Sequence, residues 1–141
     1  MHKLTKLALG LALALPLATT VHAEGNLAAN GAKLELKVDT TNNTFSQNEI
    51  DLETGKYYRL DITVDDGADD TALMMPEFFR NVWINQIVIN DMEIKVQTPY
   101  SLEWDAGGTI NLSFVPIRPG EYDFWIDGYQ DKGLKGKFVV K

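Results

Sequence analysis

The stretch that decides the fold lies at the C-terminal end, where residues Pro119 to Val140 read PGEYDFWIDGYQDKGLKGKFVV. It begins with a Pro-Gly turn, and the residues Tyr122, Phe124 and Ile126 then place apolar side chains on alternate positions. After a glycine-containing loop, Phe138 and Val140 repeat this alternation. A period of two predicts two strands joined by a loop, each strand with one buried face.

The same period recurs upstream. Apolar side chains occupy every second position in the segments 34–38, 58–64, 92–96 and 110–114. Turn signals rich in Gly, Asp, Asn and Pro separate these segments, and no long segment has the period of a helix. The pattern predicts an all-β fold, a Greek-key β-sandwich of about seven or eight short, half-buried antiparallel strands.

The C-terminal stretch resembles the copper-loop end of the cupredoxins, small blue-copper proteins of the plastocyanin and azurin type. In that family a Pro-Gly turn and a Tyr-x-Phe strand lead to Cys-x2-His-x4-Met and a glycine-rich turn. This chain matches the frame without a gap, but Ile126 stands at the Cys position, Tyr129 at the His position and Leu134 at the Met position. The family's first His falls by the same resemblance at Thr71 or Ala72. The resemblance implies a cupredoxin-like domain that lacks the type 1 copper ligands.

The composition excludes a blue-copper site independently. The chain contains no cysteine, and its only histidines are His2 and His22. Residues 1–23 have the basic start, apolar stretch and small-residue end of a secretory signal, which predicts cleavage after Ala23 and loss of both histidines. A type 1 copper site needs two imidazoles, a thiolate and an axial thioether. We therefore expect no type 1 copper in the exported chain.

The signal predicts a periplasmic protein. We expect residues 24–32 to form a flexible lead-in and residues 33–141 a single cupredoxin-like domain. The apolar stretch is shorter than the roughly 20 residues that a membrane span requires, so we expect no membrane insertion after cleavage. Cleavage leaves 11 basic against 20 acidic side chains, a formal net charge of −9. Such a surface repels nucleic acid and favours cations or a basic partner.

Oxygen ligands lie in or beside the loops that would hold copper. Glu77, Asp127 and the phenol of Tyr129 offer hard oxygen atoms for a divalent cation, and Met75 offers a thioether. The chain is also similar in part to cupredoxin-like domains of bacterial periplasmic iron-uptake systems, which lack the Cys and use carboxylates at this end. Asp127 and Tyr129 carry that similarity, without the family's His. These four residues are the predicted ligands of a weakly bound cation.

Several of these features also have a purely structural interpretation. Ile126 can close an unused site with hydrocarbon, because a buried polar group without a partner costs about 2–7 kcal/mol. The methionines Met74, Met75 and Met92 serve either as core fillers or as soft ligands for Cu(I). The acidic segment 65–70 lacks the ligand spacing of an EF-hand and is typical of a solvated turn that holds Ca²⁺ loosely at most.

A protein partner is the other predicted ligand. Trp83, Trp125 and Phe79 are candidates for an aromatic contact surface, since an outward-facing Trp often marks an interface. No catalytic set is visible in the sequence, so we expect no enzyme. The first hypothesis is a non-redox accessory protein that handles a divalent cation, copper or iron. The alternative is a metal-free interaction module of a periplasmic complex.

Overall fold

The computed structural model describes residues 26–141. The expected signal peptide 1–23, its cleavage after Ala23 and the two histidines His2 and His22 lie outside the described residues. Within residues 26–141, no helix is long and apolar enough to cross a membrane.

Eleven strands make up the described part of the chain, together with one short helix and one 3-10 turn. In chain order they are β1 Ala32–Asp39, β2 Thr44–Phe45, β3 Glu49–Leu52, β4 Tyr58–Val64, β5 Thr71–Met74, α1 Pro76–Arg80, β6 Val82–Ile89, β7 Met92–Ile94, β8 Ser101–Trp104, β9 Gly108–Pro116, β10 Gly120–Ile126, η1 Gln130–Lys132 and β11 Lys135–Val140.

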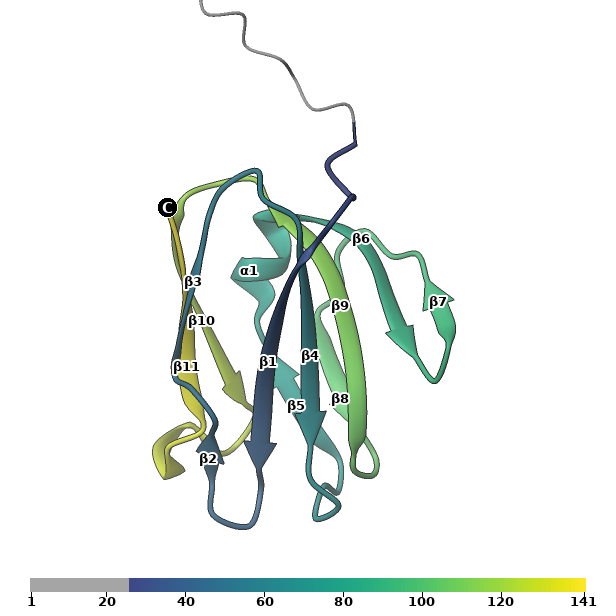
Figure 1. The fold of residues 1–141 in the computed structure, drawn as a ribbon. Coiled ribbons are helices and arrows are strands. Elements are labelled where there is room, and N and C mark those ends of the chain that lie inside the picture. Colours follow the sequence, from purple (N-terminus) through teal and green to yellow (C-terminus); the bar gives the residue numbers. More distant parts are fainter. Residues whose placement is uncertain (1–25) are drawn as a thin grey trace, which may run out of the picture.

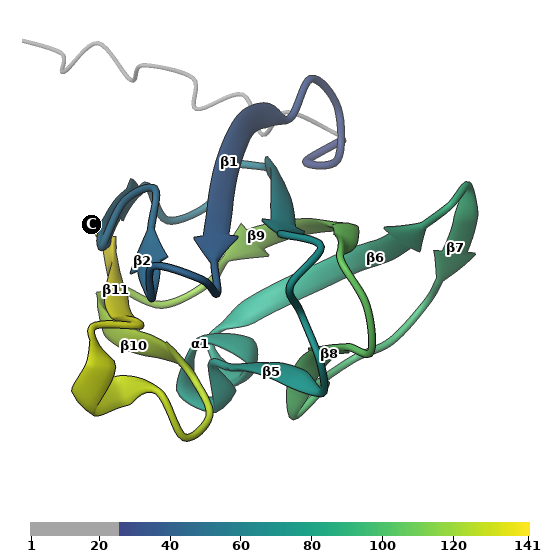
Figure 2. The same ribbon diagram turned by 90° about the horizontal axis from the view of Figure 1, so that it is seen from below.

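The strands form two packed sheets (Figure 1). Sheet A has six strands in the order β2-β1-β4-β9-β6-β7, and sheet B has five strands in the order β3-β11-β10-β5-β8. Seen from below, the two sheets form the two layers of a sandwich (Figure 2). The predicted all-β sandwich is therefore confirmed. It has more strands than predicted, because β2, β3, β5 and β8 have only two to four residues each, too few to show a clear period of two.

Two strand pairs run parallel, which differs from the antiparallel expectation. β1 pairs with β4 and β3 pairs with β11 in parallel register. Both pairs arise because the chain leaves sheet A after β2 and enters sheet B as β3 (Figure 1). Alternation in a sequence gives the face of each side chain and carries no information on strand direction.

Aromatic rings fill the core between the sheets. The ring of Phe78, from α1, stacks on Phe138 of sheet B with centroids 4.0 Å apart and meets Phe114 of sheet A edge-on at 5.1 Å. Phe124 extends the cluster, with its centroid 4.9 Å from that of Phe138. The inward sets predicted for β4, β9, β10 and β11 are all buried.

The helix α1 was not predicted, because five residues are too few to show a helical period. Pro76 occupies its first turn, where the missing N–H costs nothing. Its two phenylalanines, Phe78 and Phe79, both face the core. Through Phe78 the helix therefore packs against both sheets.

The β6–β7 hairpin extends sheet A beyond the edge of sheet B (Figure 2). Ile94 pairs with Ile87, and Met92 pairs with Ile89. Directly paired residues share a face, and Ile87 faces the core, so Met92 and Ile94 point to the inner side of sheet A. No strand of sheet B reaches far enough to cover them in the described structure. The burial that alternation predicted for residues 92–96 is consequently wrong for Met92 and Ile94.

Gly136 is required by the packing of β11. A Cβ at this position would meet the ring of Phe124 and would come 2.7 Å from the backbone oxygen of Asn48. We predict that Gly136→Ala lowers the free energy of unfolding by about 1–3 kcal/mol, the usual cost of overpacking. Urea denaturation measures this. Gly108→Ala is the matched control, since nothing lies within 4 Å of its Cβ; equal losses in both variants would contradict the packing assignment.

Candidate functional site

The positions that correspond to copper ligands meet at one end of the sandwich, the lower end in Figure 1. Thr71, Ile126, Tyr129 and Leu134 line one hollow of about 260 Å³. Thr40, Thr41, Gly67 and Asp69 complete its lining. Of the two alternatives for the family's first His, Thr71 is the residue that faces this hollow. The positions that the resemblance assigned to copper ligands therefore lie together, although three loops far apart in sequence build the hollow.

Backbone hydrogen bonds fold the C-terminal loop over the hollow. The N–H of Ile126 donates to the carbonyl of Leu134 at 3.0 Å, and the N–H of Tyr129 donates to the carbonyl of Ile126 at 3.0 Å. The N–H of Leu134 donates to the carbonyl of Tyr129 at 3.3 Å. Gly133 adopts φ 108°, a left-handed conformation that closes the turn after η1. These bonds bring the three positions together without any metal-ligand bond.

Hydrocarbon stands at two of the positions that correspond to copper ligands, Ile126 and Leu134. Ile126 is 2% exposed, and Leu134 is fully buried beside it. The phenol ring of Tyr129 lies at the surface, with the ammonium of Lys132 4.2 Å from its centroid. The lining offers hydroxyls and one carboxylate, and no imidazole, thiolate or thioether. This donor set does not fit type 1 copper.

Polar side chains in the loops near the hollow form hydrogen bonds within the protein. The hydroxyl of Thr40 donates to the carboxylate of Asp65 at 2.6 Å. The carboxylate of Asp39 accepts hydrogen bonds from the side chain and backbone of Asn42, which hold the pKa of Asp39 below its usual value. The bonds from Thr40 to Asp65 fix the loops after β1 and β4 next to each other, and the Asp39–Asn42 bonds hold the turn after β1.

The predicted metal ligands do not come together. Glu77 lies on α1, where its carboxylate forms an ion pair with Arg80 at 2.6 Å. Met75 precedes α1 and is sealed in the core. Asp127 and Tyr129 lie in the loop after β10, which Figure 1 shows well below α1. The structure therefore does not bring Glu77, Met75, Asp127 and Tyr129 together, because α1 carries Glu77 away from the loop.

Three other carboxylates do converge at this end. Oxygen atoms of Asp70, Glu103 and Asp105 all lie within 4.8 Å of one another, and the three side chains are exposed. Thr71 pairs with Trp104 at the end of the antiparallel β5–β8 ladder. Asp70 and Asp105 are the next residues on the two strands, so they lie across from each other. We call these residues the acidic trio. Sequence analysis noted Asp70 in an acidic segment but missed the others, because only strand pairing unites them.

A second hollow lies beside the acidic trio, between the β6–β7 turn and the β8–β9 loop. It has a volume of about 440 Å³ and is lined by Ile89, Asn90, Ile110 and residues 103–109. Trp104 lies in this lining and is only 5% exposed. The indole nitrogen of Trp104 is buried without a hydrogen-bond partner in the described structure. We call this feature the Trp104 hollow.

The three candidate partner residues do not form one surface. Trp83 is 47% exposed and faces outward from sheet A, opposite to the inward Val82 and Ile84. Trp125 is half-buried and faces outward from sheet B. Phe79 is buried in the core under α1, so it does not contribute to an exposed surface. The outer faces of two packed sheets point in opposite directions, which separates the two tryptophans.

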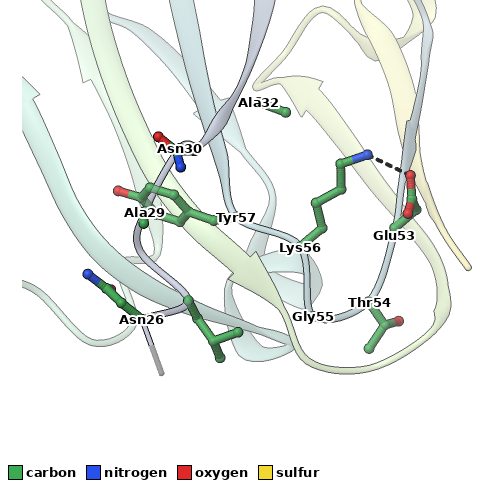
Figure 3. Close-up of a pocket in the computed structure, with 10 residues that line it drawn as sticks. Asn26, Ala29, Asn30, Ala32, Glu53, Thr54, Gly55, Lys56 and Tyr57 are labelled. Carbon is green, nitrogen blue, oxygen red and sulfur yellow. Dashed lines mark hydrogen bonds and ion pairs between the residues drawn. The ribbon is translucent and has the colours of Figure 1, made fainter. Parts of the chain in front are cut away.

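A further hollow lies at the opposite end of the sandwich (Figure 3). It measures about 440 Å³ and is formed by Asn26 to Ala32 against the β3–β4 turn. The one ion pair in its lining, Lys56 with Glu53 at 2.7 Å, is already satisfied. Gly31 packs so closely on the Tyr57 ring that a Cβ would come 2.8 Å from it. This hollow lies where residues 26–32 pack against the sandwich.

Comparison with known proteins identifies the fold. No protein-family model and no curated protein matches the chain. Among solved structures, reduced auracyanin of Roseiflexus castenholzii aligns with 79% of this chain and 99% of its own, at 18% identity and a TM-score of 0.53. The copper-containing nitrite reductase of Thermus scotoductus aligns with 78% of this chain at 14% identity and a TM-score of 0.54.

The multicopper oxidase of Pediococcus acidilactici aligns with 94% of this chain at 7% identity and a TM-score of 0.61. This chain spans 30% of that oxidase and 31% of the nitrite reductase, so the likeness covers a part of each enzyme. The similarity concerns the fold alone. The chain has the cupredoxin fold, and because it contains no cysteine it has no type 1 copper site.

Proposed function

We propose that this protein is an exported, non-enzymatic cupredoxin-like module that holds a basic protein partner at the β6–β7 edge of sheet A. The exposed apolar hairpin is the observation that carries this proposal. Met92 is 64% exposed and Ile94 is 44% exposed on its inner face. Large apolar side chains gathered on one projecting element are typical of an interaction surface.

The edge strand β7 supports the same function. All three of its residues are exposed, and it pairs only with β6, so its outer backbone groups face solvent. An open edge strand accepts an extended segment of another chain through main-chain hydrogen bonds. The acidic trio and the Trp104 hollow lie next to this edge, and the net charge of −9 after signal cleavage favours a basic partner. Export through residues 1–23 would place this encounter in the periplasm.

We predict that a photo-crosslinking amino acid at Met92 or Ile94 attaches the protein to the same basic partner in the cells that produce it. Leu27 and Ile117 are the control positions, because both are exposed and apolar but distant from the hairpin. With that partner purified, Met92→Lys should weaken binding at least tenfold, about 1.4 kcal/mol, because it removes the apolar contact and repels a basic partner. Adducts at all four positions alike, or binding unchanged by Met92→Lys, would contradict the assignment.

Cation handling by the acidic trio is the second candidate function. The carboxylate oxygens lie within 4.8 Å of one another, and in the described part of the chain none of the three forms an ion pair. Three negative charges held so close repel one another, and a bound cation would relieve this repulsion. Oxygen ligands of this kind suit Ca²⁺, which takes about 6–8 of them, with water completing the shell.

Thermal unfolding with and without CaCl₂ tests the second candidate. If the trio binds Ca²⁺, a concentration of about 100 times the dissociation constant stabilises the protein by about 2.7 kcal/mol. Asp105→Asn should abolish the rise in Tm. Asp127→Asn, an exposed carboxylate of the same end outside the trio, should leave it unchanged. A Tm that does not change when CaCl₂ is added, or a Tm that rises equally in both variants, would contradict this second function.

A further inference from the structure

We propose that β7 pairs edge to edge with β7 of a second copy of this chain, in an antiparallel register that is centred on Ile94. Sheet A of each copy would then continue into sheet A of the other across a two-fold axis. This inference goes beyond the proposed function, which concerns a different partner at the same edge. The two are linked by competition, because a basic partner that binds this edge has to displace the second copy.

The turn between β6 and β7 determines which backbone groups of β7 face outward. Asn90 and Asp91 form a two-residue turn, and both have positive φ, 47° and 65°, as a type I′ hairpin turn requires. Such a turn closes on a hydrogen-bonded pair, here Ile89 with Met92. Hydrogen-bonded and open positions alternate along an antiparallel strand. The N–H and C=O of Glu93 therefore point away from β6, and no strand among residues 26–141 pairs with that edge (Figure 2).

The same alternation continues to Lys95. Its ammonium lies 2.6 Å from the side-chain oxygen of Gln86, so the chain still runs beside β6 at this position. Two residues beyond Glu93, Lys95 has the same outward backbone orientation and lies on the same face of the sheet. Its ammonium is 3.1 Å from the Glu93 carboxylate. The edge therefore presents two open backbone positions, one with an exposed acidic side chain and one with an exposed basic side chain.

Charge selects the register of a second copy on this edge. Two antiparallel copies centred on Ile94 place Glu93 of each copy opposite Lys95 of the other, and each such pair can exchange both of its main-chain hydrogen bonds. A register centred on Glu93 or on Lys95 would place two like charges directly opposite each other, which is destabilising. A register centred on Met92 would place Glu93 opposite Asp91. The edge therefore complements itself in the register centred on Ile94.

The inner face of the edge matches the same register. Ile94 would lie opposite Ile94 of the second copy, and Met92 would lie opposite Val96. In the single copy Met92 and Ile94 are 64% and 44% exposed, whereas Val96 packs partly against the core. Positions between the hydrogen-bonded pairs bring opposing side chains closest together, so the apolar contact is greatest there. The pairing therefore gives the exposed apolar side chains of β7 the neighbours that sheet B does not supply.

Strand β1 carries the same spacing of charges on an edge that the chain itself covers. Its Glu35 and Lys37 lie beyond the short stretch that β2 pairs with. The carbonyl of Glu35 accepts a hydrogen bond from the side chain of Gln47 at 2.7 Å, and the N–H of Lys37 donates to the hydroxyl of Ser46 at 2.9 Å. The outward backbone groups of β1 are thus occupied. A charge reversal on β1 is therefore a matched control for one on β7.

The pairing joins only one short strand from each copy. Stable interfaces bury about 1,200–2,000 Å² in total, and a contact between two three-residue strands lies below that range. The net charge of −9 on each exported copy adds repulsion between them. We therefore expect a reversible monomer–dimer equilibrium, which leaves the edge accessible to a partner that binds it more tightly.

Sedimentation velocity of the purified exported protein tests the inference, in about 0.15 M NaCl to screen the overall repulsion. The fraction of dimer should rise with protein concentration. Glu93→Lys and Lys95→Glu should each lower the association constant at least fivefold, because each change places like charges opposite each other in the register centred on Ile94. Glu35→Lys, the control on β1, should leave the association constant unchanged.

A mixture of the two single variants gives the sharpest result. A Glu93→Lys copy and a Lys95→Glu copy oppose unlike charges at both positions, so the mixture should form heterodimers. The double variant that carries both changes should dimerise like the original chain, which also shows that neither change prevents folding.

A protein that stays monomeric at every concentration, or a mixture that associates no more than its components, would overturn the inference. A dimer that both single variants retain would place the interface elsewhere and would overturn it as well. The proposed function is tested separately, because a partner crosslinked at Met92 in cells differs in mass from a second copy of this chain. Such a partner would keep that function standing in either case.

Discussion

The stacking of Phe78 between the two sheets is the contact on which the rest of the structure depends. Its ring lies 4.0 Å from Phe138 and 5.1 Å from Phe114, so one side chain of α1 joins sheet B to sheet A. This contact fixes the path of the chain from β5 through α1 to β6. The path in turn places β6 and β7 beyond the edge of sheet B. The pairing of β6 with β9 then leaves the β6–β7 hairpin at the edge of sheet A.

The loop end of the sandwich has the cupredoxin fold without a type 1 copper site. In a blue-copper protein, metal-ligand bonds add to the cohesion of the loops. In this chain backbone hydrogen bonds among Ile126, Tyr129 and Leu134 hold the loop, and Ile126 and Leu134 bury hydrocarbon beside the hollow. Apolar side chains at these two positions leave no buried polar group without a partner there. The neighbouring carboxylates are left free for other ligands.

Sequence reasoning located the β-sandwich, its inward residues and the positions of the lost ligands, because alternation and loop spacing are local properties. It failed for features that depend on how distant strands and loops pack together. Glu77 is near the copper loop in the family frame, but α1 turns it away toward Arg80. Glu103 and Asp105 carry no motif, and only the register of β8 against β5 brings them to Asp70. Met92 and Ile94 alternate like core residues, yet sheet B ends before it reaches them.

Restoring the copper ligands tests most directly whether this chain is a cupredoxin frame with a closed site. The variant combines Thr71→His, Ile126→Cys, Tyr129→His and Leu134→Met, and the measurement is its visible absorption after addition of Cu(II). The account predicts the intense band of a copper–thiolate bond, since the four positions already surround one hollow. A folded variant that binds copper without this band, or does not bind it, would contradict the account.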